Sequence, residues 1–359
     1  MLGGVEAGSS RESPLGARPP EVRAVAWNLE RGIELDGIVE ACRREPLLGQ
    51  ADVLLLTEID YGMARTSNRH VAQEMARRLE LNYVFAPCYL ALTKGAGIEA
   101  DTDGENTQAL HGNAIMSPYP LEHAHTIALP NGKDKMAGRE KRLGSQRAIV
   151  AEVDHPRGCF RAVTVHLDAH SSQRHRHRQM RIVLDHLESL RPALPVLIGG
   201  DWNTTTHDAS RALYSILGYA RRVLMGVRFV LREHYPYPDR WFERRLFREL
   251  EKRGYDYRNL NVPGGCTLHY SIENLAANRN MAEWIPKWCF WFIDRALGPE
   301  GGRCSMKLDW FAGRQIRANP DSPGEGPRIL RDPGGSGIVL SDHEPIVLGF
   351  TPVSSPAGT

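Results

Sequence analysis

The stretch Leu194-Pro-Val-Leu-Ile-Gly-Gly-Asp-Trp-Asn203 decides how the rest of the chain is interpreted. Its apolar run, Val196 to Ile198, predicts a short buried strand rather than a helix. The run ends in two glycines, which leave room for a ligand or another backbone, and then in Asp201 and Asn203. A carboxylate at the mouth of a buried strand is costly unless a cation or hydrogen bonds meet it. Alone, the stretch also fits a strand that runs into an ordinary Asp/Asn turn.

Other predicted strands end in polar side chains in the same way. Three of them are Val22 to Asn28, Asp52 to Glu58 and Phe160 to His166, and two late strands carry Asp309 and Asp342-His343. Functional groups commonly cluster in loops at one edge of a rigid sheet. We therefore expect one site that collects the following residues: Asn28, Glu58, His166, Asp201, Asn203, Asp309, Asp342 and His343.

Helices are predicted between these strands, at Ile33 to Arg44, Val71 to Leu79 and Arg174 to Leu190. The last is the clearest, because its apolar residues recur with the period of a helix from Met180 to Leu187. Further strands are expected at 112–117 and 147–153. Strands that alternate with helices and then return as strands indicate a layered α/β architecture.

The chain divides into a core and three additions. We expect a disordered leader at residues 1–21, a core domain at 22–352 and a flexible tail at 353–359. The region 209–302 breaks the strand–helix rhythm and is interpreted as a partly helical insertion. It is basic, with twelve Lys/Arg against six Asp/Glu over 211–258, and aromatic, with three of the seven tryptophans between Trp284 and Ile293.

The composition is that of a globular protein. The 359 residues are 42% hydrophobic and 25% charged, and the net charge of +2 does not by itself indicate a nucleic-acid partner. Residues 1–20 lack the apolar core of a signal peptide, and the sequence has no run near the roughly 18 apolar residues of a membrane span. We therefore expect a cytoplasmic protein.

The candidate ligands point to a hard metal ion. Oxygen donors such as Glu58, Asn28 and Asp342 suit Mg²⁺ or Mn²⁺ better than zinc. The six cysteines show no zinc-ligand spacing, and the sequence contains no HExxH, GxSxG or Walker motif. Either Asp201 or the Asp309–His343 pair can activate or orient a water molecule, and a metal can neutralise a phosphoryl oxygen.

Five short motifs, taken in chain order, resemble the endonuclease/exonuclease/phosphatase superfamily. They are Asn28, Glu58, Gly-Asp-Trp-Asn at 200–203, Leu-Asp-Trp at 308–310 and Ser-Asp-His at 341–343. This superfamily includes deoxyribonucleases, abasic-site endonucleases, deadenylases, inositol-polyphosphate 5-phosphatases, neutral sphingomyelinases and a tyrosyl-DNA phosphodiesterase. The resemblance implies a four-layer α/β/β/α sandwich, in which two packed, mostly antiparallel sheets are flanked by helices.

The resemblance also implies a role for each candidate. Glu58 is the expected main metal ligand, with Asn28 and Asp342 completing the shell directly or through water. Asp201 is expected to activate or hold the nucleophilic water, and Asn203 to orient the phosphate. His343, held by Asp309, is expected to contact the scissile phosphate.

His166 helps to choose a branch of the superfamily. Thr164-Val-His-Leu-Asp168, followed by Arg176 and Gln179, resembles the THLE…R…Q pattern of the deadenylase, sphingomyelinase and tyrosyl-DNA phosphodiesterase side, with a valine inserted before His166. A phosphate-binding role for His166 is expected, and the alternative is a buried structural histidine. His170, by contrast, is expected at the surface of the next helix.

The expected activity is metal-assisted hydrolysis of a phosphodiester, by a nuclease or a related phosphodiesterase. The alternatives are a lipid phosphodiesterase or phosphoinositide phosphatase, and a non-enzymatic binding module. The insertion can act as a nucleic-acid lid, as an element that touches a membrane surface, or as additional core. The basic connection that holds Lys133, Lys135, Arg139, Lys141 and Arg142 is either solvated or phosphate-facing.

Overall fold

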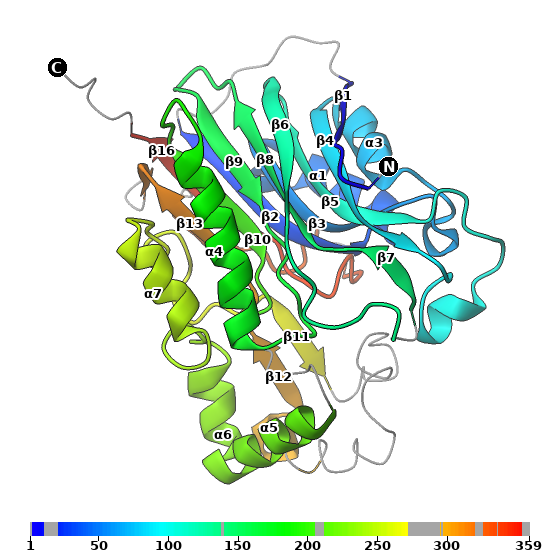
Figure 1. Cartoon of the computed structure of the whole chain (residues 1–359), viewed down its shortest axis with the longest axis vertical. Coiled ribbons are helices and arrows are strands. Elements are labelled where there is room, and N and C mark those ends of the chain that lie inside the picture. The colour runs from blue at the N-terminus through cyan, green and yellow to red at the C-terminus, as the bar shows by residue number, and fades with distance from the viewer. Residues whose placement is uncertain are drawn as a thin grey trace.

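The fold has four layers, with two sheets packed face to face and helices on both outer sides (Figure 1). The structure is a computed structural model that describes residues 2–10, 21–137, 140–204, 212–271, 295, 297–319, 326–335 and 337–353. Each sheet is antiparallel except for one parallel pair. The predicted α/β/β/α sandwich is therefore confirmed.

The first sheet runs in the order β1-β4-β5-β3-β2-β16-β14, with β7 paired to β4 and β15 to β16. Its parallel pair is β2 with β3. The strand bounds are β1 Glu6–Ser9, β2 Val22–Arg31, β3 Val53–Tyr61, β4 Asn82–Ala91, β5 Leu110–Ser117, β7 Arg142–Gly144, β14 Ile316–Ala318, β15 Arg328–Ile329 and β16 Ile346–Pro352.

The second sheet runs in the order β13-β10-β9-β8-β6, and its parallel pair is β9 with β10. The strand bounds are β6 Leu121–Ala128, β8 Arg147–Val153, β9 Phe160–Thr164, β10 Val196–Asp201 and β13 Asp309–Arg314. A separate hairpin joins β11, Leu268–Ser271, to β12, Arg303–Met306.

Helices cover the outer face of each sheet (Figure 1). The first sheet is covered by α1 Leu35–Arg44, α2 Pro46–Gly49 and α3 Val71–Leu79, and the second by α4 Gln173–Ser189 and α7 Arg244–Lys252. The remaining helical segments are η1 Ala64–Thr66, η2 Gly97–Asp101, α5 Ala212–Met225, α6 Val227–Phe229, the π-helical turn η3 Val230–His234 and η5 Gly298–Glu300.

Side-chain alternation along the strands builds the three apolar cores between these layers. In β2, Val25 and Trp27 pack against the helices of the first sheet, whereas Ala24 and Ala26 pack against the second sheet. Because successive side chains of a strand point to opposite faces, one strand can serve both cores. The third core lies between the second sheet and helices α4 and α7.

Part of the expected insertion belongs to this third core. Leu246, Phe247 and Leu250 of α7 are buried, and the ring centroid of Phe247 lies 4.5 Å from that of Trp310 in β13. Helix α7 is thus one of the two helices that cover the second sheet. The tryptophan-rich stretch Trp284 to Ile293 lies outside the described residues.

The expectation of a disordered leader is wrong for Glu6–Ser9. These residues form β1, which pairs antiparallel with the part of β4 that would otherwise be an edge of the first sheet. The carboxylate of Glu6 contacts His70 and Tyr83, at 2.8 Å from each. An edge strand offers unpaired backbone groups, and even a segment without apolar periodicity can pair with it. Residues 11–20 and 354–359 lie outside the described part of the chain.

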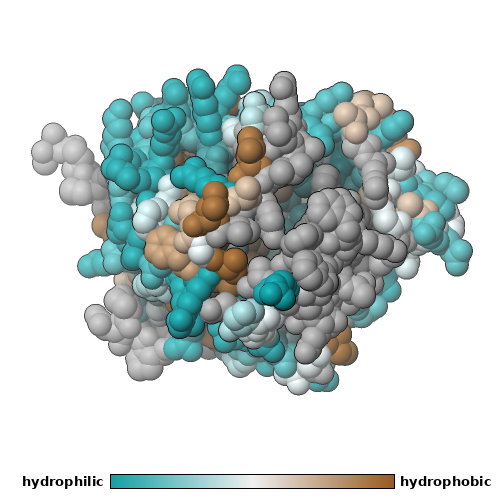
Figure 2. All heavy atoms as spheres, turned by 90° about the horizontal axis from the view of Figure 1, so that it is seen from below, coloured by the Kyte–Doolittle hydropathy of each residue, from teal (hydrophilic) through white to brown (hydrophobic). Residues whose placement is uncertain are grey.

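None of the helices in the described residues is both long enough and apolar enough to cross a membrane. Apolar side chains are exposed among hydrophilic ones at the end of the molecule that carries α5 and α6 (Figure 2). Exposed large apolar residues of this region are Tyr214, Leu217, Leu224, Phe229 and Trp241.

Candidate functional site

The site forms where the two parallel strand pairs end. Asn28 and Glu58 lie on the adjacent strands β2 and β3 of the first sheet. His166 follows β9, and Asp201 ends β10, in the second sheet. The neighbours β13 and β16 run antiparallel to β10 and β2, so the beginnings of these strands lie at the same edge. Parallel strands bring their carboxyl ends together, so this edge collects side chains from both sheets.

Asn28 links the two sheets directly. Its amide nitrogen Nδ2 lies 3.1 Å from Oε1 of Glu58 and 3.1 Å from Oδ2 of Asp201. Its Oδ1 accepts a hydrogen bond of 3.0 Å from the backbone N–H of Glu30. Asn28 is buried, and every polar atom of its side chain thus has a partner.

Irregular backbone sets the direction of the Glu58 side chain. Glu58 has φ 54° and lies where the register between β3 and β5 shifts. Glu30 and Arg31, at φ 45° and 70°, lie at a similar shift between β2 and β3. Left-handed backbone is costly for residues with long side chains and persists only where the surrounding structure holds it, often at functional sites. The carboxylate of Glu58 is directed into the site, 3.5 Å from Nη1 of Arg31.

The Gly-Asp-Trp-Asn stretch packs against the neighbouring strand as its composition suggests. Gly200 has φ 129°, and a Cβ there would lie 2.4 Å from the backbone oxygen of Val165. Gly200 therefore makes room for backbone, whereas a Cβ at Gly199 would meet the side chains of Leu55 and Phe311, so neither glycine makes room for a ligand. Asp201 accepts a hydrogen bond of 2.9 Å from the backbone N–H of Asn203, and Asn203 Nδ2 donates to the carbonyl of Leu167 at 2.9 Å.

His343 is held on two sides. Its Nδ1 lies 2.7 Å from Oδ2 of Asp309, and that oxygen also accepts a hydrogen bond of 2.6 Å from the hydroxyl of Thr267. Its backbone oxygen accepts a hydrogen bond of 2.8 Å from the indole of Trp27. The free ring nitrogen Nε2 then faces Asp201, 3.9 Å from Oδ2. Sequence reasoning missed Thr267, since no motif connects it to Asp309, 42 positions away.

His166 lies on the other side of Asp201, with its Nε2 3.5 Å from Oδ2. The loop after it is fixed by the helix that carries the remaining motif residues. Gln179 Oε1 accepts a hydrogen bond of 3.0 Å from the backbone N–H of Asp168, and Arg176 Nη1 lies 3.3 Å from the carbonyl of Ser171. Arg176 and Gln179 are fully buried. Their contacts are those of residues that position this loop.

Burial and charge divide the titratable groups. Burial and the nearby Asp309 raise the pKa of Asp201 to about 7. Burial lowers the pKa of His166 to about 4. Burial would also lower the pKa of His343, but the negative charges of Asp309 and Asp201 outweigh it and place this pKa well above 6.5. The site therefore combines a carboxylate that titrates near neutrality with an imidazolium.

Glu58 remains ionised in this surrounding. Burial alone would raise the pKa of its carboxyl, but the positive charge of Arg31 outweighs that effect and holds the pKa well below its usual range. Glu30, which lies beside Asp342, has a pKa raised to about 7 by burial and by the negative charge of Asp342. Several carboxylates thus share one small region.

The donor set fits a hard divalent cation. Ligand atoms of Glu58, His166 and Asp201 lie within 4.8 Å of one another, and so do those of Asp201, Asp309 and His343. Oxygen atoms dominate both groups, as Mg²⁺ and Mn²⁺ prefer. The charges of Asp309 and Glu58 add to the effect of burial on the pKa of Asp201, and a bound cation relieves such repulsion. Asp342, predicted as a third ligand, lines the same cleft from the loop before β16.

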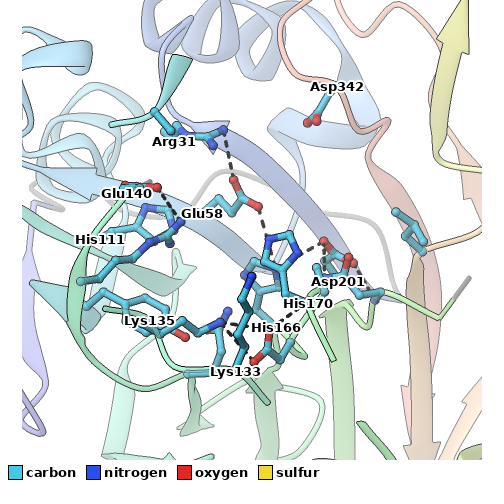
Figure 3. A pocket seen from close by; sticks show the side chains of 18 of the residues that line it. Arg31, Glu58, His111, Lys133, Lys135, Glu140, His166, His170, Asp201 and Asp342 are labelled. Atoms are coloured by element: carbon cyan, nitrogen blue, oxygen red, sulfur yellow. Dashed lines mark hydrogen bonds and ion pairs between the residues drawn. The ribbon is translucent and has the colours of Figure 1, made fainter. Parts of the chain in front are cut away.

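A cleft with a cavity volume of 560 Å³ opens over these residues (Figure 3). Its lining includes Glu58, His166, Asp201, Asn203, Asp342 and His343, and Asn28 and Asp309 lie directly beneath through their hydrogen bonds. The structure therefore brings all eight predicted residues to one place. Lys133, Lys135 and Arg142 of the basic connection line it as well. His170 was expected at the surface of the helix but also lines the cleft, so that expectation is wrong.

Part of one wall of the cleft comes from the expected insertion, which includes β11 but ends at residue 302, just before β12. The hairpin β11–β12 contributes Leu268, Tyr270 and Met306, and Leu268 forms a β-bridge with His343. This segment therefore lies beside the catalytic candidates. Arg31 and Tyr270 also line the cleft and were not predicted. Arg31 could have been predicted from the sequence, because it lies only three positions after Asn28.

Comparison with known proteins agrees with this geometry. A sequence model described as the endonuclease/exonuclease/phosphatase family matches residues 25–343. No curated protein matches the chain. An endonuclease/exonuclease/phosphatase structure from Beutenbergia cavernae DSM 12333 is 17% identical, with a TM-score of 0.55, and the match covers 94% of this chain and 73% of that one. At this identity the similarity shows the shared fold.

Two further structures are more distant. The human Nocturnin catalytic domain with a bound sulfate anion is 16% identical, with a TM-score of 0.48, and the match covers 97% of this chain and 96% of that one. TDP2 of D. rerio complexed with a single-strand DNA product is 13% identical, with a TM-score of 0.46, and 93% of this chain and 100% of that one are covered.

Proposed function

The chain belongs to the endonuclease/exonuclease/phosphatase family, and from this premise we propose that it hydrolyses a phosphodiester with the help of Mg²⁺ or Mn²⁺. Members of the family are generally divalent-metal-dependent hydrolases that act on phosphoester bonds. The preferred substrate is a nucleic acid or a nucleotide. The observation that carries the proposal is the position of Asp201 between His166 and His343, at 3.5 and 3.9 Å.

In this proposal Asp201 takes the proton of the attacking water. A general base works best when its pKa is close to the operating pH, and the pKa of Asp201 is raised to about 7 by burial and by Asp309. His343, fixed by Asp309, donates a hydrogen bond from Nε2 to the phosphate. Asn203 and His166 hold the phosphate oxygens, since both line the cleft next to Asp201.

Glu58 would hold the cation, with Asn28 and Asp342 completing its shell directly or through water. A bound cation neutralises charge on a phosphoryl oxygen. Arg31 keeps Glu58 ionised and in place when the cation is absent.

The test is hydrolysis of bis-p-nitrophenyl phosphate beside p-nitrophenyl phosphate, with Mg²⁺, with Mn²⁺ and with a chelator. We expect cleavage that favours the diester, stops with the chelator and is lost in Glu58→Gln. Preference for the monoester, or turnover that survives both the chelator and Glu58→Gln, would contradict the proposal.

A lipid phosphodiester is the second candidate. It is favoured by the exposed apolar residues of the region around α5, among which Leu217 is 56% and Leu224 is 88% exposed. Such residues can enter the headgroup layer of a membrane. Hydrolysis of sphingomyelin in vesicles, compared with hydrolysis of a short single-stranded oligonucleotide, separates the two substrates. A strong preference for vesicles that disappears in Leu224→Asp would favour the lipid.

A further inference from the structure

The loop between β6 and β7 brings positive charge to one side of the catalytic cleft. Its described residues, 129–137 and 140–141, lead into β7, and Lys133, Lys135 and Arg142 line the cleft together with His170. Figure 3 shows Lys133 and Lys135 on the same side of the cleft, beside His166 and His170. The proposed hydrolysis of a single phosphodiester assigns no role to these cations.

Lys135 is fixed in place rather than solvated. Its Nζ lies 3.1 Å from both carboxylate oxygens of Asp168, and its side chain is 15% exposed. Asp168 also accepts a hydrogen bond of 2.7 Å from the backbone N–H of Gly132. Asp168 is two positions after His166, so this contact ties the basic loop to the strand end that carries His166. An ammonium group has three donors, and the pair with Asp168 leaves one for a ligand.

An aromatic ring holds two of the cations. The Nζ of Lys135 lies 5.7 Å, and the guanidinium carbon of Arg142 5.3 Å, from the ring centroid of Tyr89. The hydroxyl of Tyr89 lies 3.1 Å from Oδ1 of Asn131, at the beginning of the same loop. Tyr89 lines the cleft as well. The ring thus gives both cations defined positions, which a solvated loop would not need.

The cations also repel one another. Burial lowers the pKa of Lys135; the charge of Asp168 opposes this effect, and the charges of Arg142 and Lys133 add to it. Burial and the charge of Lys135 lower the pKa of the nearby His170 to about 4, so this ring is neutral at neutral pH. Carboxylates offset part of this charge, since Asp168 pairs with Lys135 and Glu140 pairs with Arg142, whose Nη2 lies 2.5 Å from Oε2 of Glu140. Lys135 and Arg142 still line the cleft, where a second phosphate can reach donors that these carboxylates do not occupy.

We propose that Lys133, Lys135 and Arg142 form a second anion subsite, which binds another phosphate of the substrate beside the scissile one. This inference rests on the proposed phosphodiesterase function and narrows its substrate. A substrate with one isolated phosphodiester leaves the subsite empty. The preferred substrate is therefore a nucleotide or oligonucleotide that carries a second phosphate, either at its terminus or within the chain.

Calorimetric binding of dithymidine compounds tests the subsite, with Ca²⁺ in place of Mg²⁺ to slow turnover. The probes are TpT, its 5′-phosphorylated form pTpT, its 3′-phosphorylated form TpTp and the trinucleotide TpTpT. We expect at least one of the last three to bind about tenfold more tightly than TpT, the effect of one charged hydrogen-bonded contact. If pTpT or TpTp binds more tightly than TpT and TpTpT does not, the subsite takes a terminal phosphate. If TpTpT also binds more tightly than TpT, the subsite accepts a phosphate within the chain.

Lys133→Gln and Lys141→Gln form the matched pair of variants. Lys133 lines the cleft, whereas Lys141 belongs to the same connection and is exposed. Lys133→Gln should lose most of the tenfold preference, and Lys141→Gln should keep it. Arg142→Gln provides a second test that leaves the contact between Lys135 and Asp168 in place. Equal binding of all four probes, or equal losses in Lys133→Gln and Lys141→Gln, would overturn the subsite.

The outcomes separate the two proposals. Hydrolysis of bis-p-nitrophenyl phosphate with equal binding of TpT and the phosphorylated probes would leave the phosphodiesterase standing and remove the subsite. A preference that Lys133→Gln abolishes, in a protein that hydrolyses no diester, would support the subsite and contradict the phosphodiesterase.

Discussion

Oδ2 of Asp309 lies 2.7 Å from Nδ1 of His343, deep at the base of the cleft. Both side chains are buried, and Thr267 fixes the same carboxylate oxygen from behind. The pair therefore keeps the imidazole charged and turns Nε2 toward Asp201. The contact with Asp309 thus both orients the His343 ring and favours its charged form.

Replacing Asp309 by Asn should move the whole pH profile of kcat/KM to lower pH. The negative charge of Asp309 raises the pKa of both His343 and Asp201. Without it, His343 loses its proton at lower pH and Asp201 becomes an active base at lower pH, so both limbs shift in the same direction. A profile with an unchanged alkaline limb would show that protonated His343 is not required.

His343→Ala should lower kcat/KM by about 10²–10⁴.

Magnesium should raise the melting temperature through Glu58. A ligand that binds only the folded state at a hundred times its Kd adds about 2.7 kcal/mol to the free energy of unfolding. Thermal unfolding with MgCl₂ and with a chelator should show this shift in the native protein and not in Glu58→Gln. Glu40→Gln, which changes a carboxylate of α1 whose side chain is 45% exposed and pairs with Arg44, is the control and should keep the shift. Equal shifts in both variants would remove Glu58 from the metal site.

Gly200→Ala should destabilise the protein more than Gly158→Ala does. The two glycines have similar φ angles, 129° and 125°, so the backbone strain, about 1–3 kcal/mol, is shared. Only at Gly200 does a Cβ meet backbone, 2.4 Å from the oxygen of Val165, whereas nothing lies within 4 Å at Gly158. Urea unfolding measures both losses. Since Val165 precedes His166, Gly200→Ala should also lower turnover, and equal losses of stability would mean that the packing at Gly200 adapts freely.

The buried pair of Arg176 and Glu243 predicts how the free energy of unfolding changes when one or both of its charges are removed. Nε of Arg176 lies 2.9 Å from Oε1 of Glu243, and both side chains are inaccessible to solvent. Arg176→Ala leaves the Glu243 carboxyl buried without its partner, at a place where burial already raises its pKa to about 7, and should cost about 3–5 kcal/mol in the free energy of unfolding.

The double variant Arg176→Met with Glu243→Leu removes both charges and should regain most of that loss. Recovery should stay incomplete, because Arg176 also lies within 3.3 Å of the carbonyl of Ser171. Denaturant titrations of the single and double variants supply the comparison. A double variant as unstable as Arg176→Ala would show that packing, rather than charge pairing, dominates there.

The catalytic candidates were predictable because strong local signals carry them. Buried strands such as Arg147–Val153 and the helix Val71–Leu79 have the predicted bounds, since their apolar residues follow a regular period. The motifs then mark the strand ends. Parallel pairing of β2 with β3 and of β9 with β10 brings those ends together.

Other features depend on contacts that no local pattern encodes. The edge strands β1 and β6 were not predicted; Glu6–Ser9 has no apolar periodicity, and Leu121–Ala128 is half exposed and contains two histidines. Thr267 and the three cations that line the cleft, Lys133, Lys135 and Arg142, lie in or next to loops. The path of such a loop depends on contacts with residues far away in the sequence, such as the contact of Lys135 with Asp168. The choice between a solvated and a cleft-facing basic loop could be made only from the structure.

The hydrogen bonds of Asn28 to Glu58 in one sheet and to Asp201 in the other have a consequence for how this chain can diverge in evolution. The two halves of the active centre are held in register by the apolar layer between the sheets, which includes Ala26, Leu55 and Ala162. A bulkier residue there that stability tolerates can still slide one sheet over the other and part the catalytic groups. Selection on activity should therefore restrict this interior layer more tightly than selection on folding alone, and should leave the layers beneath the helices freer to drift.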